Sequence, residues 1–183
     1  MRNRVLAAIT AAALLVTPAV ASAADAPDKL LAPESACPGQ SDRSLPPSVQ
    51  TATMVCMHQY ARAQAGLPQL HQSKKLRTSS SRKARDVMRC KQFSHTACGR
   101  DAFYWFRRVG FMKGNFGVGE NLVLGSGDGG TVRSGMSGWL HSDLHRSILL
   151  TASFDRLGIG LVTGEFHGFK GTAVWVAHFG YQH

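Results

Sequence analysis

The four cysteines are the residues whose type and spacing point most directly to a chemical reaction. In an exported chain an even number of cysteines is typical of disulfide bonds, and four cysteines allow three pairings. We favour Cys37–Cys56 and Cys90–Cys98, because each pair joins near neighbours in the chain. A zinc site is the rival interpretation, but the chain has no C-x-x-C spacing. Each disulfide would stabilise the fold by roughly 2–4 kcal/mol.

Eight histidines offer a second kind of chemistry, since imidazole binds metals and transfers protons near neutral pH. Taken singly, His95 and His145 have structural interpretations, as hydrogen-bonding residues of a loop and of the core. Glu120 would equally well satisfy buried backbone donors. His178 alternates with apolar neighbours on a strand and could face either way. We expect a further set of histidines to lie at the surface: His58, His71, His167 and His183.

The first 23 residues predict export. Arg2 and Arg4 give a positive start, residues 5–20 form an uncharged apolar run, and residues 21–23 present the small side chains that a signal peptidase recognises. A membrane anchor is less favoured, because Pro18 interrupts a run that is short for a span of roughly 20 residues. We therefore predict a signal peptide over residues 1–23, no transmembrane segment after its cleavage, and a secreted product.

The charge indicates which partners to expect. Removing Arg2 and Arg4 with the signal peptide lowers the formal net charge from +10 to +8. A basic exported protein is attracted to anionic envelope surfaces such as phospholipid headgroups or wall polymers. We expect no nucleic-acid partner, because the basic residues are spread along the chain and no nucleic-acid motif frames them. The remaining length suits one domain, which we expect to be a monomer.

The pattern of apolar residues predicts the elements that must position these side chains. Residues 24–47 are rich in Pro, Ala, Ser and Asp and indicate a flexible leader, so the domain would cover residues 48–183. Spacings of three and four predict a helix from Pro47 to a stop at Gly66, with one face formed by Val49, Ala52, Cys56, Tyr60 and Ala63.

Further helices are predicted over residues 73–88, 102–109 and 132–142, the first of them with a strongly basic, solvated outer face. Two strands, 157–162 and 172–179, would pair as an antiparallel hairpin through a turn at 164–171, and residues 121–124 would add a short third strand. The glycine-rich residues 125–130 form a loop. This order of elements predicts an α+β fold, layered as α-β-α.

Six short motifs follow one another along residues 50–180. They are Arg62 with Gly66-Leu67 and Leu70; Phe93-Ser94-His95; Gly119-Glu120-Asn121; Trp139, Ser142, His145-Arg146 and Ile148-Leu149; Phe154 with Gly158-Ile159-Gly160; and Trp175 with Phe179-Gly180. In this order they resemble the bacterial, SCP-like branch of the CAP superfamily, which contains cysteine-rich secretory proteins, antigen 5 and pathogenesis-related proteins. The resemblance implies the family's α-β-α sandwich, with a small antiparallel sheet between helices.

The same resemblance implies that His95, Glu120 and His145 share a cleft, as the candidate catalytic and metal-binding residues. Two imidazoles and a carboxylate are a chemically suitable set for a divalent metal such as zinc, with water in the open position. Without a metal, Glu120 could orient one histidine while the other moves a proton. His141 and Ser142 flank the same helix end as further ligand-binding candidates. We expect Ser142 to cap the turn before His145 rather than to act as a nucleophile.

The chain departs from the family pattern at several positions. Gln59 stands where Asn is usual, Ser79 and Ser80 where Ala is common, and His141 where animal members carry a second glutamate. The usual set of two histidines and two glutamates is therefore incomplete, which favours a binding module over an enzyme. Its partner would be a small ligand, a lipid or a cell-wall component. The alternative is a secreted hydrolase acting on peptide or peptidoglycan bonds.

Overall fold

The middle layer of the protein is a four-stranded sheet with the order β1-β3-β4-β2. This computed structural model describes residues 27–183, so the predicted signal peptide lies outside the described residues. The strands are β1 (His71–Gln72), β2 (Phe116–Gly125), β3 (Arg156–Phe166) and β4 (Phe169–Gln182). No helix within the described part of the chain is long and apolar enough to cross a membrane.

The β3–β4 hairpin is longer and more tightly turned than the sequence predicts. Its turn consists of His167 and Gly168, which have φ angles of 49° and 87°. Two left-handed residues suit the twist of a two-residue hairpin turn, so the strands continue almost to the tip. β2 pairs antiparallel with β4 over its whole length, from Phe116 to Gly125. β1, which the sequence pattern did not predict, pairs with β3 in parallel at the edge of this otherwise antiparallel sheet.

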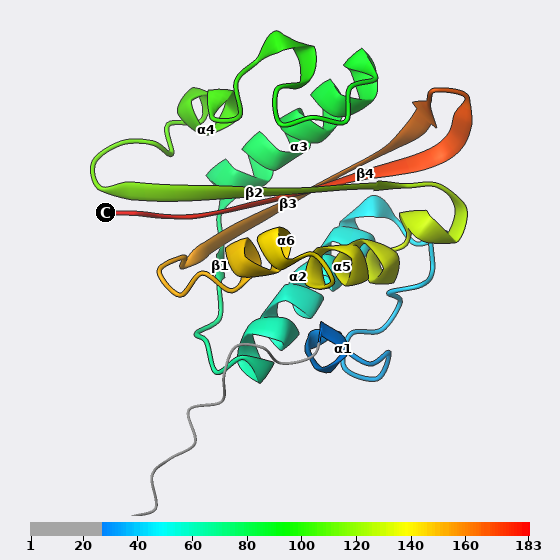
Figure 1. The fold of residues 1–183 in the computed structure, drawn as a ribbon, viewed down its shortest axis with the longest axis horizontal. Coiled ribbons are helices and arrows are strands. Elements are labelled where there is room, and N and C mark those ends of the chain that lie inside the picture. Colours follow the sequence, from blue (N-terminus) through cyan, green and yellow to red (C-terminus); the bar gives the residue numbers. More distant parts are fainter. Residues whose placement is uncertain (1–26) are drawn as a thin grey trace, which may run out of the picture.

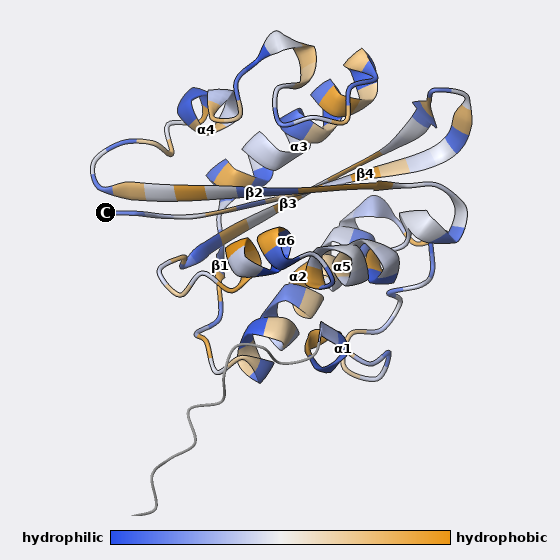
Figure 2. Ribbon diagram, viewed as in Figure 1, coloured by the Kyte–Doolittle hydropathy of each residue, from blue (hydrophilic) through white to orange (hydrophobic). Residues whose placement is uncertain are grey.

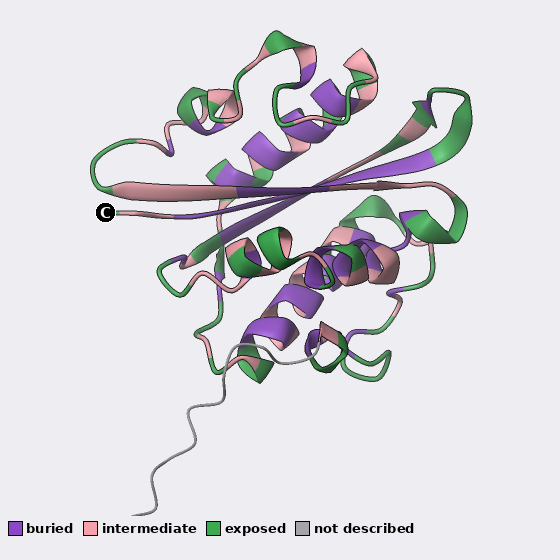
Figure 3. Ribbon diagram, viewed as in Figure 1, coloured by how far each residue is buried: buried purple, intermediate pink, exposed green. Residues whose placement is uncertain are grey.

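One face of the sheet carries α1 (Pro27–Leu30), α2 (Pro47–Gln64), α5 (Val132–Leu140) and α6 (Asp143–Leu149), as Figure 1 shows. Between these helices and the sheet lies the larger apolar core, to which α2 contributes Met54, Met57 and Ala61 and α5 contributes Met136, Trp139 and Leu140. The buried residues follow the inner side of α2 and the middle of β4 in Figure 3.

The opposite face carries α3 (Lys74–Cys90) and α4 (Tyr104–Arg108), which completes the predicted α-β-α layering. Hydrophilic and hydrophobic residues alternate around α3 in Figure 2, as expected for a helix with one face on the sheet. Glycines let the α3 backbone approach β3 closely. A Cβ atom at Gly160 would lie 2.4 Å from the carbonyl carbon of Ser80, and one at Gly158 would lie 2.1 Å from the amide nitrogen of Arg77.

Both predicted disulfides are present. Cys37–Cys56 ties the segment before α2 to that helix, and Cys90–Cys98 closes the loop between the end of α3 and the short helix η1 (Ala97–Gly99). The segment interpreted as a flexible leader contains α1 and places Leu30 and Ala32 in the core from Pro27 onward. Packing of this kind is not what a flexible leader predicts. The glycine-rich loop contains a second short helix, η2 (Gly127–Gly130).

Arg62 explains one motif of the resemblance in structural terms. Its side chain is fully buried near the end of α2. The guanidinium donates hydrogen bonds to four carbonyl oxygens, those of Pro68 (2.9 Å), Leu149 (3.0 Å), Thr151 (3.0 Å) and Phe154 (3.2 Å). Burial lowers the pKa of Arg62. The residue fixes the chain between α6 and β3 against α2, and so helps to position α6.

Candidate functional site: a histidine–glutamate cluster

Glu120, in the middle of β2, is the centre of the cluster. Its register partner on β4 is His178, so the two side chains lie on the same face of the sheet, beneath α3. Nε2 of His178 donates to Oε2 of Glu120 over 2.7 Å, and Nδ1 of His95 donates to Oε1 over 2.6 Å. His95 comes from the loop closed by Cys90–Cys98, and its side chain is about half exposed, at 51%.

His178 continues the hydrogen-bond chain into the protein interior. It is fully buried, and the ring of Phe106 stacks on it with a centroid distance of 4.1 Å. Nε2 of His178 faces the carboxylate, and Nδ1 lies 2.7 Å from the Ser79 hydroxyl, which also donates to the Leu76 carbonyl oxygen over 2.9 Å. Burial lowers the pKa of His178, although the hydrogen bond to Glu120 opposes this shift.

Lys83 holds the His95 loop in place from α3. The side chain is 2% exposed, its Nζ donates to the carbonyl oxygen of His95, and the same atom lies 3.9 Å from Oε1 of Glu120. Burial lowers the pKa of Lys83, while the negative charges of Glu120 and Asp86 raise it.

The surroundings of Glu120 favour its ionised form. Burial alone would raise its pKa, but the hydrogen bonds from His178 and His95, with the charge of Lys83, outweigh burial and lower the pKa to about 2. Glu120 is therefore an ionised acceptor at every physiological pH. It orients imidazole rings and holds no proton to donate.

His145 belongs to α6, and its Nδ1 lies 2.8 Å from Oγ of Ser142. Ser142 occupies the N-cap position of α6, but its side chain makes no capping hydrogen bond and contacts His145 instead, which corrects its predicted role. Asn121, next to Glu120 in β2, donates from Nδ2 to the His145 carbonyl oxygen over 2.9 Å. Burial and, secondly, the charge of His95 lower the pKa of His145.

His141 does not join the cluster around Glu120. Its Nδ1 lies 2.9 Å from the Ser137 carbonyl oxygen, and its Nε2 lies 3.4 Å from Oδ1 of Asp28 on α1. The structure thus brings the predicted His95 and Glu120 into direct contact with each other, and it joins the His145 backbone to Asn121, the neighbour of Glu120 in β2. It adds three residues that sequence reasoning did not assign to the site, His178, Ser79 and Lys83.

His58, predicted at the surface, is fully buried. Its ring packs against Trp139 and Phe179 at centroid distances of 5.5 and 5.6 Å, and its Nδ1 lies 2.7 Å from the Met54 carbonyl oxygen. Burial lowers the pKa of His58 to about 4. One signal could have found this position, because Met54, His58 and Ala61 recur at spacings of four and three in α2.

The donor atoms indicate which residues could bind a metal. Within residues 27–183 no three His, Cys, Asp or Glu side chains form a ready ligand set. Both carboxylate oxygens of Glu120 already accept imidazole N–H groups. The hydrogen bonds of His95 and His145 in the described structure use Nδ1, which leaves Nε2 of each ring as a potential ligand. These two nitrogens suit zinc, with Glu120 as the outer partner that orients His95.

A comparison with known families decides the wider classification. The model of the cysteine-rich secretory protein family, CAP, matches residues 55–179, which include Glu120, His95, His145 and His178.

The chain belongs to the CAP family.

Three solved structures with the same fold are distant in sequence. An extracellular protein from Bacillus anthracis with an SCP domain is 19% identical with a TM-score of 0.57, and the match covers 74% of this chain and 43% of that one. An outer surface protein from Borrelia burgdorferi is 16% identical with a TM-score of 0.62, over 76% of this chain and 97% of that one. A cysteine-rich secretory protein from Staphylococcus aureus is 18% identical with a TM-score of 0.52, over 70% and 38%.

The CAP domain thus spans less than half of the Bacillus and Staphylococcus chains and nearly all of the Borrelia chain. At these identities the likeness shows the fold alone. No curated protein matches the chain.

Proposed function

We propose that this CAP domain is an extracellular binding module that holds a divalent metal, with zinc as the first candidate, between Nε2 of His95 and Nε2 of His145. The observation that carries the proposal is the 2.6 Å hydrogen bond from His95 Nδ1 to Glu120. It fixes the ring and the tautomer, so that the Nε2 lone pair is offered to a ligand. A carboxylate behind a metal-binding histidine commonly has this role.

His145 has a matching arrangement, with Nδ1 held by Ser142 over 2.8 Å. Two fixed imidazoles would supply two of the four positions that zinc prefers, and the other two would be left for water or a small ligand. The bound metal would supply a positive charge that attracts anionic groups of such a ligand.

The extracellular location has three lines of support. The first 23 residues have the pattern of a signal peptide. All four cysteines pair, as is usual in oxidising compartments. The Bacillus protein with the same fold is described as extracellular, and the Borrelia protein as an outer surface protein.

A calorimetric titration with zinc chloride at pH 7.5 tests the metal site. We expect saturable binding to the wild type and a loss of affinity of at least about tenfold in His95→Ala and in His145→Ala, because each removes one ligand. His141→Ala is the matched control, since this residue lies at the same helix end but contacts Ser137 and Asp28. No binding to the wild type, or equal binding to the double variant His95→Ala/His145→Ala, would refute the proposal.

Glu120→Gln separates orientation from ligation. The amide keeps the size of the side chain but loses the negative charge that accepts from His95 and His178. We expect zinc affinity to fall by roughly 10–100-fold while the fold is retained, as checked by the circular dichroism spectrum. Unchanged affinity in this variant would show that Glu120 does not prepare His95.

The hydrolase alternative has weaker support. Ser79, His178 and Glu120 follow one another in the order of a hydrolytic triad, but Ser79 is 0% exposed, so a substrate could not reach its hydroxyl. In the hydrolase alternative, His95 held by Glu120 would be the base for water attack. Release of fragments from peptidoglycan or peptide by the wild type, abolished in His95→Ala, would favour the hydrolase over the binding module.

A further inference from the structure

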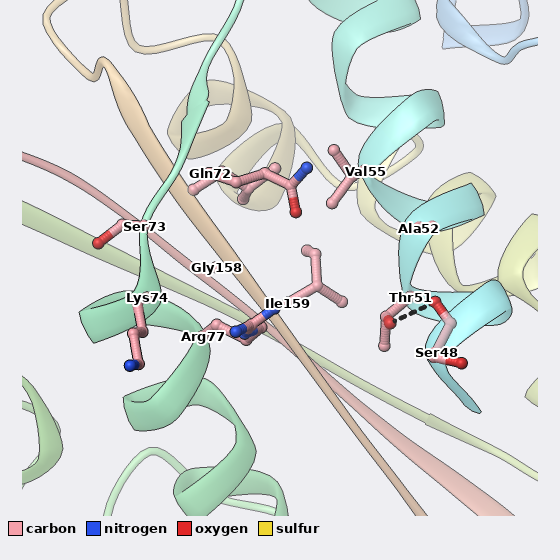
Figure 4. Close-up of a pocket in the computed structure, with 11 residues that line it drawn as sticks. Ser48, Thr51, Ala52, Val55, Gln72, Ser73, Lys74, Arg77, Gly158 and Ile159 are labelled. Atoms are coloured by element: carbon pink, nitrogen blue, oxygen red, sulfur yellow. Dashed lines mark hydrogen bonds between the residues drawn. The ribbon is translucent and has the colours of Figure 1, made fainter.

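A groove of about 390 Å³ lies at the edge of the sheet that is farthest from β2 and Glu120. Three elements line it: α2 on one side, the junction of β1 with α3 on the other, and β3 along the floor (Figure 4). In Figure 4 the Gln72 side chain reaches toward Val55 across one end of the groove. The groove is therefore separate from the histidine–glutamate cluster.

The floor of the groove is the free edge of β3. β1 pairs with β3 at Arg156 and Leu157, and the chain then leaves the sheet to begin α3. The amide of Ser73 donates to the Leu157 carbonyl oxygen over 2.8 Å, so the backbone groups of odd-numbered β3 residues point away from β4. The next such residue, Ile159, lines the groove and directs its N–H and C=O groups toward it, and Leu161 continues the same edge of β3 beyond the groove.

These backbone groups have no hydrogen-bond partner among the described residues, although Ile159 is only 4% exposed. Buried backbone groups are nearly always paired in folded proteins, because an unpaired one loses the hydrogen bond that water would give it. The edge of β3 is thus a template for one more strand, in line with β1.

The two walls of the groove differ in chemistry. The side chain of Ile159 faces α2, where Ala52 and Val55 are apolar and the Thr51 hydroxyl is turned back to the Ser48 carbonyl oxygen over 3.0 Å. The even-numbered Gly158 and Gly160 face α3 instead, and the exposed cations Lys74 and Arg77 stand on that side.

Neither Lys74 nor Arg77 forms an ion pair within residues 27–183, and none of the described residues that line the groove is acidic. In an added strand, alternate side chains would point to opposite walls. One set would meet the apolar wall of α2 and the other the cations of α3.

We propose that this groove binds an extended peptide segment with alternating apolar and acidic residues, which adds a strand to the free edge of β3. Backbone hydrogen bonds to Ile159 and Leu161 hold the peptide, and the side-chain alternation sets its register. The apolar residues pack on Ala52 and Val55, and the acidic residues pair with Lys74 and Arg77.

A second copy of the chain fits this edge less well. Two β3 edges that paired about a two-fold axis would bring Lys74 and Arg77 of both copies together, and like charges at an edge are a common protection against such pairing. The positive charge of Lys74 and Arg77 therefore favours an acidic partner over self-association.

Fluorescence anisotropy with a labelled Val-Glu-Val-Glu-Val-Glu peptide at low salt tests the proposal. We expect saturable binding to the wild type, and binding weakened roughly five- to tenfold by Arg77→Glu, which replaces an attraction by a repulsion. Arg85→Glu is the matched control, because Arg85 is an exposed arginine of α3 outside the groove and the change in net charge is the same. Equal weakening by both variants would overturn the assignment of the site.

Two further measurements separate strand addition from simple charge attraction. A peptide with methylated backbone nitrogens keeps the charges but cannot form the ladder, so it should not bind. Hydrogen exchange should show that the unmodified peptide protects the amides of Ile159 and Leu161. No saturable binding at peptide concentrations up to about 1 mM, undiminished binding of the methylated peptide, unprotected amides, or formation of dimers in sedimentation without peptide would each overturn the proposal.

Discussion

Replacing His58 by leucine should make the protein more resistant to acid. His58 is fully buried, and its Nε2 has no hydrogen-bond partner in the described structure. The folded protein therefore resists protonating this ring, whereas the unfolded chain protonates it at an ordinary pKa. Leucine is of similar size, and it removes the titrating group from between Trp139 and Phe179.

The magnitude follows from the shift in pKa from 6.5 to about 4. The folded-state value is the lower one, so His58 costs no stability above pH 6.5, and stability is lost as the pH falls from 6.5 toward 4. At pH 4.5 the ring is protonated in most unfolded chains but in a minority of folded ones. This difference lowers the free energy of unfolding by about 2.5 kcal/mol. Glu120 affects stability over a different pH range, because the stability that it contributes is lost only as the pH falls from 4.5 toward about 2.

Urea denaturation at pH 7.5 and pH 4.5 measures this effect. We expect the free energy of unfolding to fall between the two pH values in both proteins, but by about 2.5 kcal/mol less in His58→Leu than in the wild type. His178 is also buried with a lowered pKa, and its contribution remains in both proteins. The exposed His71 supplies the control, because His71→Leu should retain the pH dependence of the wild type. An equal loss of stability in His58→Leu and the wild type would refute the reasoning.

Three other substitutions test the packing that positions the sites, each by chemical denaturation. Gly160→Ala should destabilise the fold by roughly 1–3 kcal/mol, because its Cβ would collide with the backbone of Ser80, and an unchanged stability would mean that α3 can move away. Arg62→Ala should cost roughly 3 kcal/mol or more by leaving buried carbonyl oxygens unpaired, and a loss below about 1 kcal/mol would contradict that role. The double variant Cys90→Ser/Cys98→Ser should lose roughly 2 kcal/mol of stability. It should also bind zinc more weakly, because it frees the loop that carries His95. Unchanged zinc affinity would show that Lys83 alone holds this loop in place.

The periodicity of the sequence located α2 but indicated the wrong face. Val49, Ala52, Cys56, Tyr60 and Ala63 recur at helical spacing, yet Val49 is 41% exposed. The buried face contains polar residues that the pattern does not count as core, since Gln50, Thr53, His58 and Arg62 lie among its methionines and alanine. Polar residues with specific hydrogen-bond partners can be buried, but their partners are distant in the chain and cannot be read from spacing. The same error placed His58 at the surface.

The strands show a related limit. β2 begins at Phe116, but only residues 121–124 were predicted as a strand. The prediction was too short because the glycines at 117 and 119 interrupt the apolar alternation. Both glycines are required by packing: a Cβ at Gly119 would lie 2.9 Å from atoms of Ile148 and Phe154, and one at Gly117 would lie 2.5 Å from the Tyr181 ring. β1 has two residues and depends on a distant parallel partner, so no local pattern could reveal it.

The cluster around Glu120 was predictable as a group of residues but not as a network. Motif order identified Glu120 and His95, while the contact with His178 depends on the register of β2 with β4. Once that register is known, the orientation of His178 follows, because it shares a face with Val174 and Val176, which pack beneath α3.

One departure from the family pattern, Ser79, is in direct contact with the buried His178. A histidine buried against a carboxylate uses Nε2–H for that contact, so its Nδ1 lone pair needs a donor within the core. The Ser79 hydroxyl is the polar group at Nδ1, 2.7 Å away, and it also hydrogen-bonds the Leu76 carbonyl oxygen over 2.9 Å; alanine at this position would leave Nδ1 without a polar neighbour. Ser79 therefore gives the buried His178 a polar partner in the interior, and the hydrogen bond from His178 in turn helps to keep Glu120 ionised beside His95. The half-exposed His95 is thus oriented by Glu120, which is the middle of a hydrogen-bond chain that runs through His178 to the buried Ser79 of α3.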